Sequence, residues 1–202
     1  MTENLINILT TEKILPVIRS KEPENAINIA MALADGGIKV LEIVVETPSI
    51  YKAIEKISEF SYVCAGGIIT TMQADAAIQS GAKIISSPIF SMNLVKLSKD
   101  KKIPYIPGTS SANEAYTAWK ARMPLIKIYP ISAMGGVNYI ENIIRPMPFL
   151  NLIAQGNVKL GEVKSFINAG AKVVGVGRDI YQDCSLNEIK HKAELIINEL
   201  KG

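Results

Sequence analysis

A lysine lies in the middle of a short apolar stretch, residues 123–130. Ile126 and Ile128 flank Lys127, so the stretch is typical of a buried strand whose charged group cannot run along a surface to water. Burial disfavours the charged ammonium form, and a neutral amine is a nucleophile suited to a carbonyl, with which it forms a Schiff base. The alternative is that Lys127 sits at the end of its strand and reaches solvent.

A carboxylate lies inside a second apolar stretch, residues 38–45. Side chains alternate along a strand, so Glu42 and Glu46 share one face and the opposite face is wholly apolar. A buried carboxylate is costly unless it is paired or used. Glu42 therefore either faces the interior near Lys127 or points outward and pairs with a helix. We favour the interior, because the apolar face suits helix packing better, and an interior Glu and Lys would form a base and nucleophile pair.

Composition narrows the class of protein. The chain has 202 residues and 48% hydrophobic residues, which suits one domain over 1–202 with a full core. A net charge of +3 without an aromatic-rich basic run argues against nucleic acid, and no stretch is long enough to span a membrane.

Cys64 and Cys184 lack metal-ligand spacing, no signal peptide is seen, and we expect a cytoplasmic protein. The single histidine, His191, lies in a polar helix pattern, which excludes Ser–His–Asp chemistry and most zinc sites.

The strands must place these two residues together. Eight strand–helix units follow one another, at about 25 residues each. Near-continuous apolar strands are typical of parallel sheets covered on both faces, so we predict an α/β fold, a single (β/α)8 TIM barrel with a short N-terminal helix. A doubly wound open sheet is the alternative, but no GxGxxG follows the first strand. The expected strands are 14–18, 38–45, 62–65, 82–86, 103–106, the lysine strand, 149–154 and 172–176, and the expected helices are 2–10, 23–34, 48–58, 71–80, 92–99, 111–121, 135–144, 159–169 and 186–200.

Several motifs, in order over residues 12–180, resemble the 2-keto-3-deoxy-6-phosphogluconate (KDPG) and 4-hydroxy-2-oxoglutarate (KHG) aldolase family. They lie at 16–19, 37–42, 87–88, 106–108 and 126–130, the last with Gly-Gly at 135–136. The resemblance implies a (β/α)8 barrel, a homotrimer, and neither a metal nor an organic cofactor. It also implies that Lys127 is the Schiff-base lysine and Glu42 the general acid/base.

The implied reaction is a class I aldol cleavage of a 2-keto acid, possibly phosphorylated. Lys127 would attack the ketone, and Glu42 would shuttle protons and take the proton of the hydroxyl beyond the bond that breaks. The products would be pyruvate, or a glyoxylate-derived analogue, and an aldehyde.

The sequence departs from the family where the substrate carboxylate binds. Glu46 stands where the family usually has an arginine, and a like charge about 4 Å away would cost about 4 kcal/mol at an effective dielectric near 20. Glu46 must then turn away or pair with Arg19. Gly67 stands where the family has a substrate-contacting threonine, after Gly66.

The expected phosphate cradle is also altered. The family's Thr-Gly-Gly after the seventh strand ends here in Gly156, and its Gly-Ser after the eighth strand reads Gly177-Arg178. Arg178 either grips a phosphate or pairs with Asp179 or Glu162. The full substrate-binding set expected from the resemblance is Arg19, Glu46, Gly66, Gly67, Pro88, Thr109, Gly156, Gly177 and Arg178.

Helix capping competes with substrate binding at residues 109–111, and we favour capping. Two other functions compete with the aldolase. One is an inactive family member that only binds a small molecule. The other is a phosphate-binding barrel such as an epimerase or decarboxylase, which wants Asp or His at strand ends and ranks last.

Overall fold

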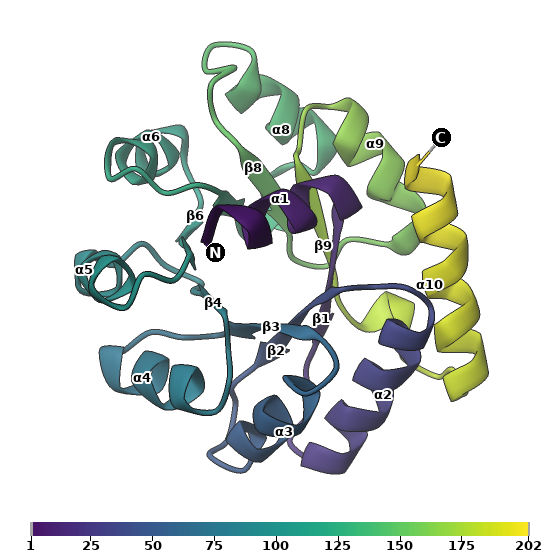
Figure 1. Ribbon diagram of the computed structural model, residues 1–202. Coiled ribbons are helices and arrows are strands. Elements are labelled where there is room, and N and C mark those ends of the chain that lie inside the picture. The colour runs from purple at the N-terminus through teal and green to yellow at the C-terminus, as the bar shows by residue number, and fades with distance from the viewer. Residues whose placement is uncertain (1, 202) are drawn as a thin grey trace.

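The computed structural model describes residues 2–201. Its strands form one parallel sheet in the order β5-β4-β3-β2-β1-β9-β8-β7-β6, which curls into a ring surrounded by helices (Figure 1). The strands are β1 (Ile14–Ile18), β2 (Val40–Val44), β3 (Tyr62–Gly66), β4 (Ile84–Ser86), β5 (Tyr105–Ile106), β6 (Gly108–Thr109), β7 (Ile126–Ile128), β8 (Leu152–Gln155) and β9 (Val173–Val176).

The short strands β5 and β6 are two halves of one strand, separated by Pro107. Before this proline the chain pairs with β4, and after it the chain pairs with β7. Proline has no N–H to give to a ladder, but its carbonyl accepts a hydrogen bond from the Lys127 amide at 2.8 Å. The strand thus joins the two edges of the sheet, and the predicted eight-stranded barrel is confirmed.

Helices cover the outside of the ring, and α1 lies across one end of it (Figure 1). The helices are α1 (Thr2–Glu12), α2 (Pro23–Asp35), α3 (Ile50–Ile57), α4 (Thr71–Gln79), α5 (Met92–Lys101), α6 (Ala112–Lys120), α7 (Ile131–Met134), α8 (Val137–Ile144), α9 (Val163–Asn168) and α10 (Leu186–Lys201), with 3-10 turns η1 (Leu160–Glu162) and η2 (Arg178–Ile180). No helix in the described range 2–201 is long and apolar enough to cross a membrane.

Several predicted helix boundaries differ from the structure by two or more residues, and glycines explain two of the late starts. The helix expected at 135–144 begins only at Val137, because Gly135 and Gly136 have φ of 118° and 63°, values that interrupt a right-handed helix. The short α7 precedes them and was not predicted. The helix expected at 159–169 begins with the 3-10 turn η1, which contains Gly161, and glycine disfavours a regular helix.

The N-terminal end of the barrel is filled by a closed apolar layer. Each barrel strand, with β5 and β6 taken as one, contributes one buried side chain, which for β7 is Leu125 directly before the strand. Leu5 and Leu9 of α1 pack against this layer from below. A second core lies between the sheet and the outer helices and includes Leu41 and Ile43. The strand-borne members of the inner layer are Leu15, Val40, Cys64, Ile84, Ile106, Leu125, Ile153 and Val173.

Candidate active site

A layer of polar side chains lies directly above the apolar layer inside the barrel. Glu42, Ser86, Lys127 and Gln155 are 1%, 0%, 3% and 6% exposed. Each stands two residues after an inner-layer residue, which lies in the same strand or, for Lys127, directly before it. The period of two therefore brings all four to the interior. The outward alternative for Glu42 and the solvent-reaching alternative for Lys127 are therefore wrong.

The amine and the carboxylate face each other in this layer. Lys127 Nζ lies 3.7 Å from Glu42 Oε1 and donates a hydrogen bond of 2.7 Å to Ser86 Oγ. The ring of Tyr129 lies on another side of the amine, with its centroid 5.7 Å from Nζ. A buried charge pair needs such additional partners, since its desolvation is costly.

Gln155 completes the layer on the side of the carboxylate. Its Nε2 donates to Glu42 Oε1 at 3.3 Å. Glu42 Oε2 is buried and has no hydrogen-bond partner among the described residues. One carboxylate oxygen is thus held by the protein, and the other is free to accept a proton or a hydrogen bond from a ligand.

Two glycines make room for this layer. A Cβ at Gly66 would collide with the Glu42 carboxylate, and a Cβ at Gly175 would lie 2.7 Å from Gln155 Oε1. Beneath them, burial raises the pKa of the Cys64 thiol, and the negative charge of Glu42 raises it further. The thiol therefore stays protonated, and Cys64 serves as buried packing in the inner layer.

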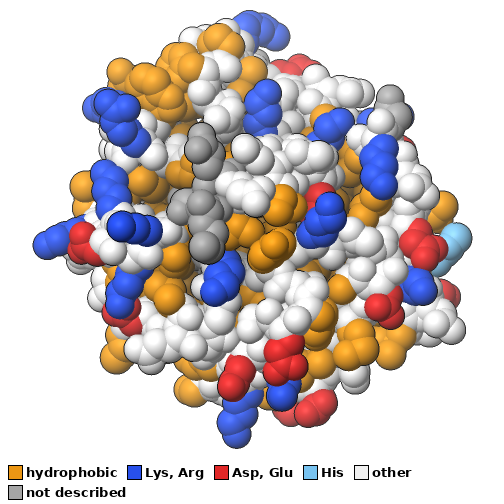
Figure 2. All heavy atoms as spheres, in the orientation of Figure 1, with side chains coloured by type: hydrophobic (Ala, Val, Ile, Leu, Met, Phe, Trp, Pro, Cys, Tyr) orange, Lys and Arg blue, Asp and Glu red, His pale blue; other side chains and the backbone are white. Residues whose placement is uncertain are grey.

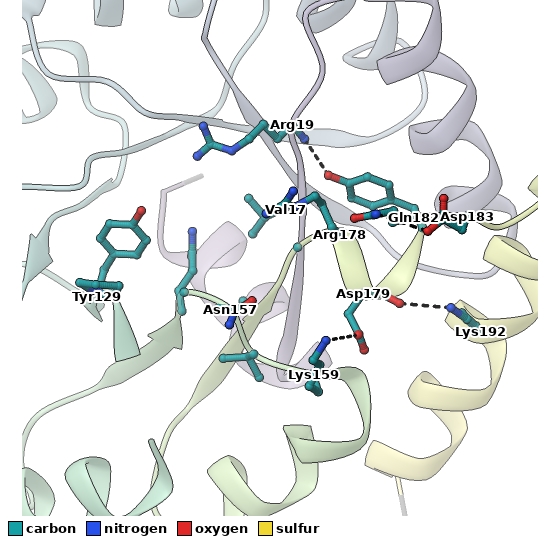
Figure 3. Close-up of a pocket in the computed structure, with 17 residues that line it drawn as sticks. Val17, Arg19, Tyr129, Asn157, Lys159, Arg178, Asp179, Gln182, Asp183 and Lys192 are labelled. Atoms are coloured by element: carbon teal, nitrogen blue, oxygen red, sulfur yellow. Dashed lines mark hydrogen bonds and ion pairs between the residues drawn. The ribbon is translucent and has the colours of Figure 1, made fainter. Parts of the chain in front are cut away.

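A cleft of about 1180 Å³ opens at the carboxyl ends of β1, β7, β8 and β9 (Figure 3). Gln155 and Gly175 form part of its wall, so the cleft meets the polar layer. Four cationic side chains line it, against two carboxylates, which makes it a place for an anionic ligand. The lining residues are Val17, Arg19, Tyr129, Pro130, Gln155, Gly156, Asn157, Val158, Lys159, Gly175, Gly177, Arg178, Asp179, Tyr181, Gln182, Asp183 and Lys192.

Arg19 and Glu46 form an ion pair at the ends of neighbouring strands. Of the two alternatives for Glu46, pairing is the one observed. The Arg19 side chain is half exposed, its backbone amide donates to the Tyr181 hydroxyl at 3.2 Å, and it extends in the direction of Tyr129 (Figure 3). A guanidinium has five N–H donors, so one bond to Glu46 leaves others for a ligand.

Arg178 follows β9 and lines the cleft. Its expected carboxylate partners are engaged elsewhere: Asp179 accepts from Lys159 Nζ at 3.1 Å and from the Leu160 amide at 2.8 Å, and Glu162 accepts from the Lys159 amide. The Leu160 N–H bond, followed by the Lys159 ammonium, lowers the pKa of Asp179. The surface-pairing alternative for Arg178 is therefore wrong.

The structure brings only part of the expected substrate-binding set into the cleft. Arg19, Gly156, Gly177 and Arg178 line it, whereas the other five expected residues do not. Glu46 contacts Arg19, and Gly66 underlies Glu42. Gly67, at φ 74°, lies against the end of β2, and Pro88 packs on Gly108.

Thr109 is held by the strand that carries the lysine. Its hydroxyl is buried and donates to the Lys127 carbonyl at 3.2 Å. The helix cap predicted in this segment belongs to Ser111, which forms a capping box with Glu114. Thr109 thus neither caps α6 nor reaches the cleft.

The sequence prediction missed Ser86 and Gln155. Both stand at the carboxyl ends of apolar strands, on the same face as the inner-layer residues Ile84 and Ile153. The period of two that placed Glu42 would also have found them. Neutral polar residues at strand ends are common, however, so the pattern alone does not indicate a functional role for Ser86 or Gln155 as it does for a buried charge.

A closed parallel barrel with a buried amine and carboxylate beneath an electropositive cleft defines a (β/α)8 protein suited to carbonyl chemistry. A family model, "KDPG and KHG aldolase", matches residues 5–195. The chain belongs to this family, as the resemblance in its motifs predicted.

Relatives of known name agree with this assignment. The chain is 29% identical over 164 residues to a KHG/KDPG aldolase of Escherichia coli, covering 80% of this chain and 77% of the relative. It is 27% identical over 179 residues to a 2-dehydro-3-deoxy-phosphogluconate aldolase of Treponema pallidum, covering 86% and 83%.

Solved structures show the same fold. A KDPG aldolase of Legionella pneumophila, with pyruvate captured as a covalent carbinolamine intermediate, has a TM-score of 0.86 and 26% identity, covering 95% of this chain and 97% of that one. The 2-keto-3-deoxy-6-phosphogluconate aldolase of Zymomonas mobilis has a TM-score of 0.88 at 21% identity, covering 97% and 96%.

Proposed function

We propose that the protein is a class I aldolase that cleaves a 2-keto-4-hydroxy acid to pyruvate and an aldehyde. The observation that carries this proposal is the buried amine of Lys127, 3.7 Å from Glu42 and 2.7 Å from Ser86, beneath a cleft with excess positive charge. Membership of the aldolase family supports it. In this proposal Lys127 is the nucleophile and Glu42 the general acid/base.

The first stage joins the substrate to the enzyme. Glu42 takes a proton from the Lys127 ammonium, and the amine so formed attacks the C2 carbonyl carbon. A second proton passes from the attacking nitrogen to the carbonyl oxygen, which becomes the hydroxyl of a carbinolamine. Glu42 then gives a proton to this hydroxyl, which leaves as water, and an iminium remains. Ser86, the amine's hydrogen-bond partner, keeps Nζ directed into the barrel.

The second stage breaks the carbon–carbon bond. Glu42 takes the proton of the C4 hydroxyl, the C3–C4 electron pair moves into the iminium, and C4 leaves as an aldehyde. The resulting enamine takes a proton at C3 from Glu42, and water hydrolyses the new iminium to release pyruvate. The unpartnered Glu42 Oε2 is the oxygen available for these transfers.

We assign the two ends of the substrate to two arginines of the cleft, Arg19 after β1 and Arg178 after the neighbouring strand β9. Arg19, steadied by Glu46, would bind the C1 carboxylate. Arg178, beside Gly156 and Gly177, would bind a phosphate or another anion at the far end. The support is their place in the cleft lining and the absence of an ion pair to Arg178 in the described part of the chain.

Borohydride trapping with pyruvate tests the proposal. The wild type should gain the mass of one reduced pyruvate, on the peptide that contains Lys127. Lys127→Met should gain none, whereas Lys159→Met, the same change at a cleft lysine that is 64% exposed, should still be labelled. A wild type that is not labelled and turns over no keto acid would instead be a small-molecule-binding barrel.

The proposal extends to assembly and location. We propose a homotrimer in the cytoplasm. Tyr116, Trp119 and Phe149 are 38%, 40% and 45% exposed. Tyr116 stacks on Trp119, and the ring of Phe149 lies tilted against the ring of Trp119. Figure 2 shows hydrophobic side chains gathered near α6 and the loop after α8. Such a patch suits a subunit interface. Light scattering should give three times 21.9 kDa, and Trp119→Ser should lower this mass.

A further inference from the structure

A second cavity lies at the end of the barrel opposite to the cleft. Its volume is about 390 Å³, and it opens where α1 meets the segments that lead into β5 and β7. Ile6 of α1, Ile103 before β5 and Met123 before β7 supply its apolar wall. The proposed cleavage uses none of these residues, and the volume suits a small organic molecule.

The rim of this cavity is cationic. Lys99, Lys102 and Arg122 line it, and no carboxylate does so among the described residues. Within residues 2–201, neither Lys99 nor Arg122 has an ion pair. Figure 2 shows Lys and Arg side chains gathered over α5 and α6, to one side of α1. An apolar wall with excess positive charge at its rim attracts a ligand that has an apolar body and an anionic group.

Two of these cations occupy unusual backbone positions. Lys102 follows α5 directly, Arg122 comes two residues after α6, and their φ angles are 56° and 64°. Helices often end with a residue in this left-handed conformation, which is usually glycine, because a Cβ atom is crowded there. Strain of this kind clusters at ligand-binding sites, which favours a role for these long side chains in binding over a role in the turn alone.

We propose that this cavity is a binding site for an aromatic carboxylate. The ring of the ligand packs on Ile103 and Met123, since a thioether makes favourable contacts with aromatic rings. The carboxylate binds Arg122, whose fork of N–H donors matches two carboxylate oxygens, and Lys99 adds a second positive charge. Because this site lies at the other end of the barrel, the inference does not depend on the proposed cleavage.

Binding should stabilise the fold. The cavity wall combines α1 with the entries to β5 and β7, two strands that lie on either side of the break at Pro107. A ligand held by all three segments binds the folded chain and not the unfolded one, so it raises Tm. At ten times its Kd, 4-phenylbutanoate should raise Tm by about 3–6 °C.

A fluorescent apolar anion serves as the probe of the wild type. 8-Anilinonaphthalene-1-sulfonate is titrated at low salt, and 4-phenylbutanoate and 4-phenylbutan-1-ol, which share a ring and a chain and differ in the end group, compete with it. We expect the carboxylate to displace the probe at about tenfold lower concentration than the alcohol, since the alcohol lacks the charge-assisted hydrogen bonds. An apolar pocket without the charges would instead favour the alcohol.

Variants locate the probe. Arg122→Gln removes one charge of the rim and should weaken binding of the probe and of 4-phenylbutanoate by about tenfold, with little effect on the alcohol. Arg178→Gln, the same change at an arginine of the cleft, should leave all three affinities unchanged. Trp119→Ser, which alters the exposed aromatic side chains of α6, should leave them unchanged as well.

Several results would overturn this proposal. One is a wild type that does not bind the probe, and another is an alcohol that competes as well as the carboxylate. Equal binding by Arg122→Gln and the wild type would mean that the cations only complement the helix ends. Binding that is lost in Arg178→Gln or Trp119→Ser would place the probe elsewhere.

Light scattering during the titration should show a constant mass, whereas a mass that falls as the probe binds would make the cavity an interface between copies of the chain. If Arg122→Gln does not fold, Lys99→Gln takes its place with the same expectation. The comparison of carboxylate and alcohol on the wild type needs no variant.

Discussion

At the scale of single residues, the site balances the cost of desolvating two charged groups against the gain from pairing them. Lys127 and Glu42 are almost fully buried, and an ionised group in such surroundings is costly unless several partners compensate. Ser86 and Gln155 are those partners, one for each charge. Neither carries charge itself, and both help to fix where the reacting atoms stand.

Ser86 should therefore matter to the rate at which the amine attacks. Ser86→Ala removes the 2.7 Å partner of Nζ, and we expect the pyruvate adduct to form about tenfold more slowly. Stopped reactions trapped with borohydride measure this rate. Ser98→Ala removes another buried serine hydroxyl, whose partner within residues 2–201 is the Val95 carbonyl of its own helix, and it should form the adduct at the wild-type rate. Equal rates in both variants would remove Ser86 from the positioning of Lys127.

At the scale of elements, the loops after β8 and β9 hold one another in place. Asp179 of η2 accepts hydrogen bonds from Lys159 and from the Leu160 amide of η1, and Lys192 of α10 donates to the Asp179 carbonyl at 3.1 Å (Figure 3). The Asp179 carboxylate thus links the loop after β8 to the loop after β9, and both loops line the cleft.

This tie should appear in the pH dependence of stability. The pKa of Asp179 is lowered in the folded protein, so its contribution is present above the unfolded pKa, about 3.9, and is lost as the pH falls through the folded value. Asp179→Asn should lower Tm by about 2–4 °C at pH 7.

Scanning calorimetry from pH 7 to pH 3 checks the sign. The difference in Tm between wild type and Asp179→Asn should shrink toward the acid end. A difference that stays constant, or one of similar size in the control Asp183→Asn, would contradict the assigned tie.

The sequence predicted the barrel and its two charged interior residues for the same reason: strong patterns leave few alternatives. A lysine and a glutamate within apolar strands violate the usual pattern, so Lys127 and Glu42 stood out. Ser86 and Gln155 did not, because their importance arises from neighbours brought from other strands. The pairing of Arg19 with Glu46 was one of two alternatives, and choosing between them needed the positions of two side chains from separate strands.

At the scale of the whole molecule, stability and chemistry occupy opposite ends of the barrel. The apolar layer and α1 fill the N-terminal end, while the polar layer and the cleft lie at the C-terminal end. In (β/α)8 barrels generally, the active site lies at the C-terminal end, whereas the N-terminal end contributes to stability. Changes beneath the apolar layer should then affect folding more than turnover.

Leu9 tests this division. It is fully buried between α1 and the barrel, and Leu9→Ala should destabilise the protein by about 2–5 kcal/mol. Below the melting transition, kcat should be unchanged. Leu195→Ala, the same change at a side chain that is 56% exposed, should cost less than about 0.5 kcal/mol. Denaturant unfolding monitors the first quantity and steady-state assays the second.

The break at Pro107 links the reactive lysine to the integrity of the ring. β5 pairs with β4 and β6 with β7, and the Lys127 amide donates to the proline carbonyl at that seam. Separation of β6 from β7 would open the barrel. It would also break the backbone hydrogen bond of Lys127, the proposed nucleophile, in the same event. Hydrogen exchange at the Lys127 amide therefore reports the fraction of molecules in which the barrel has opened and the lysine strand has lost this hydrogen bond.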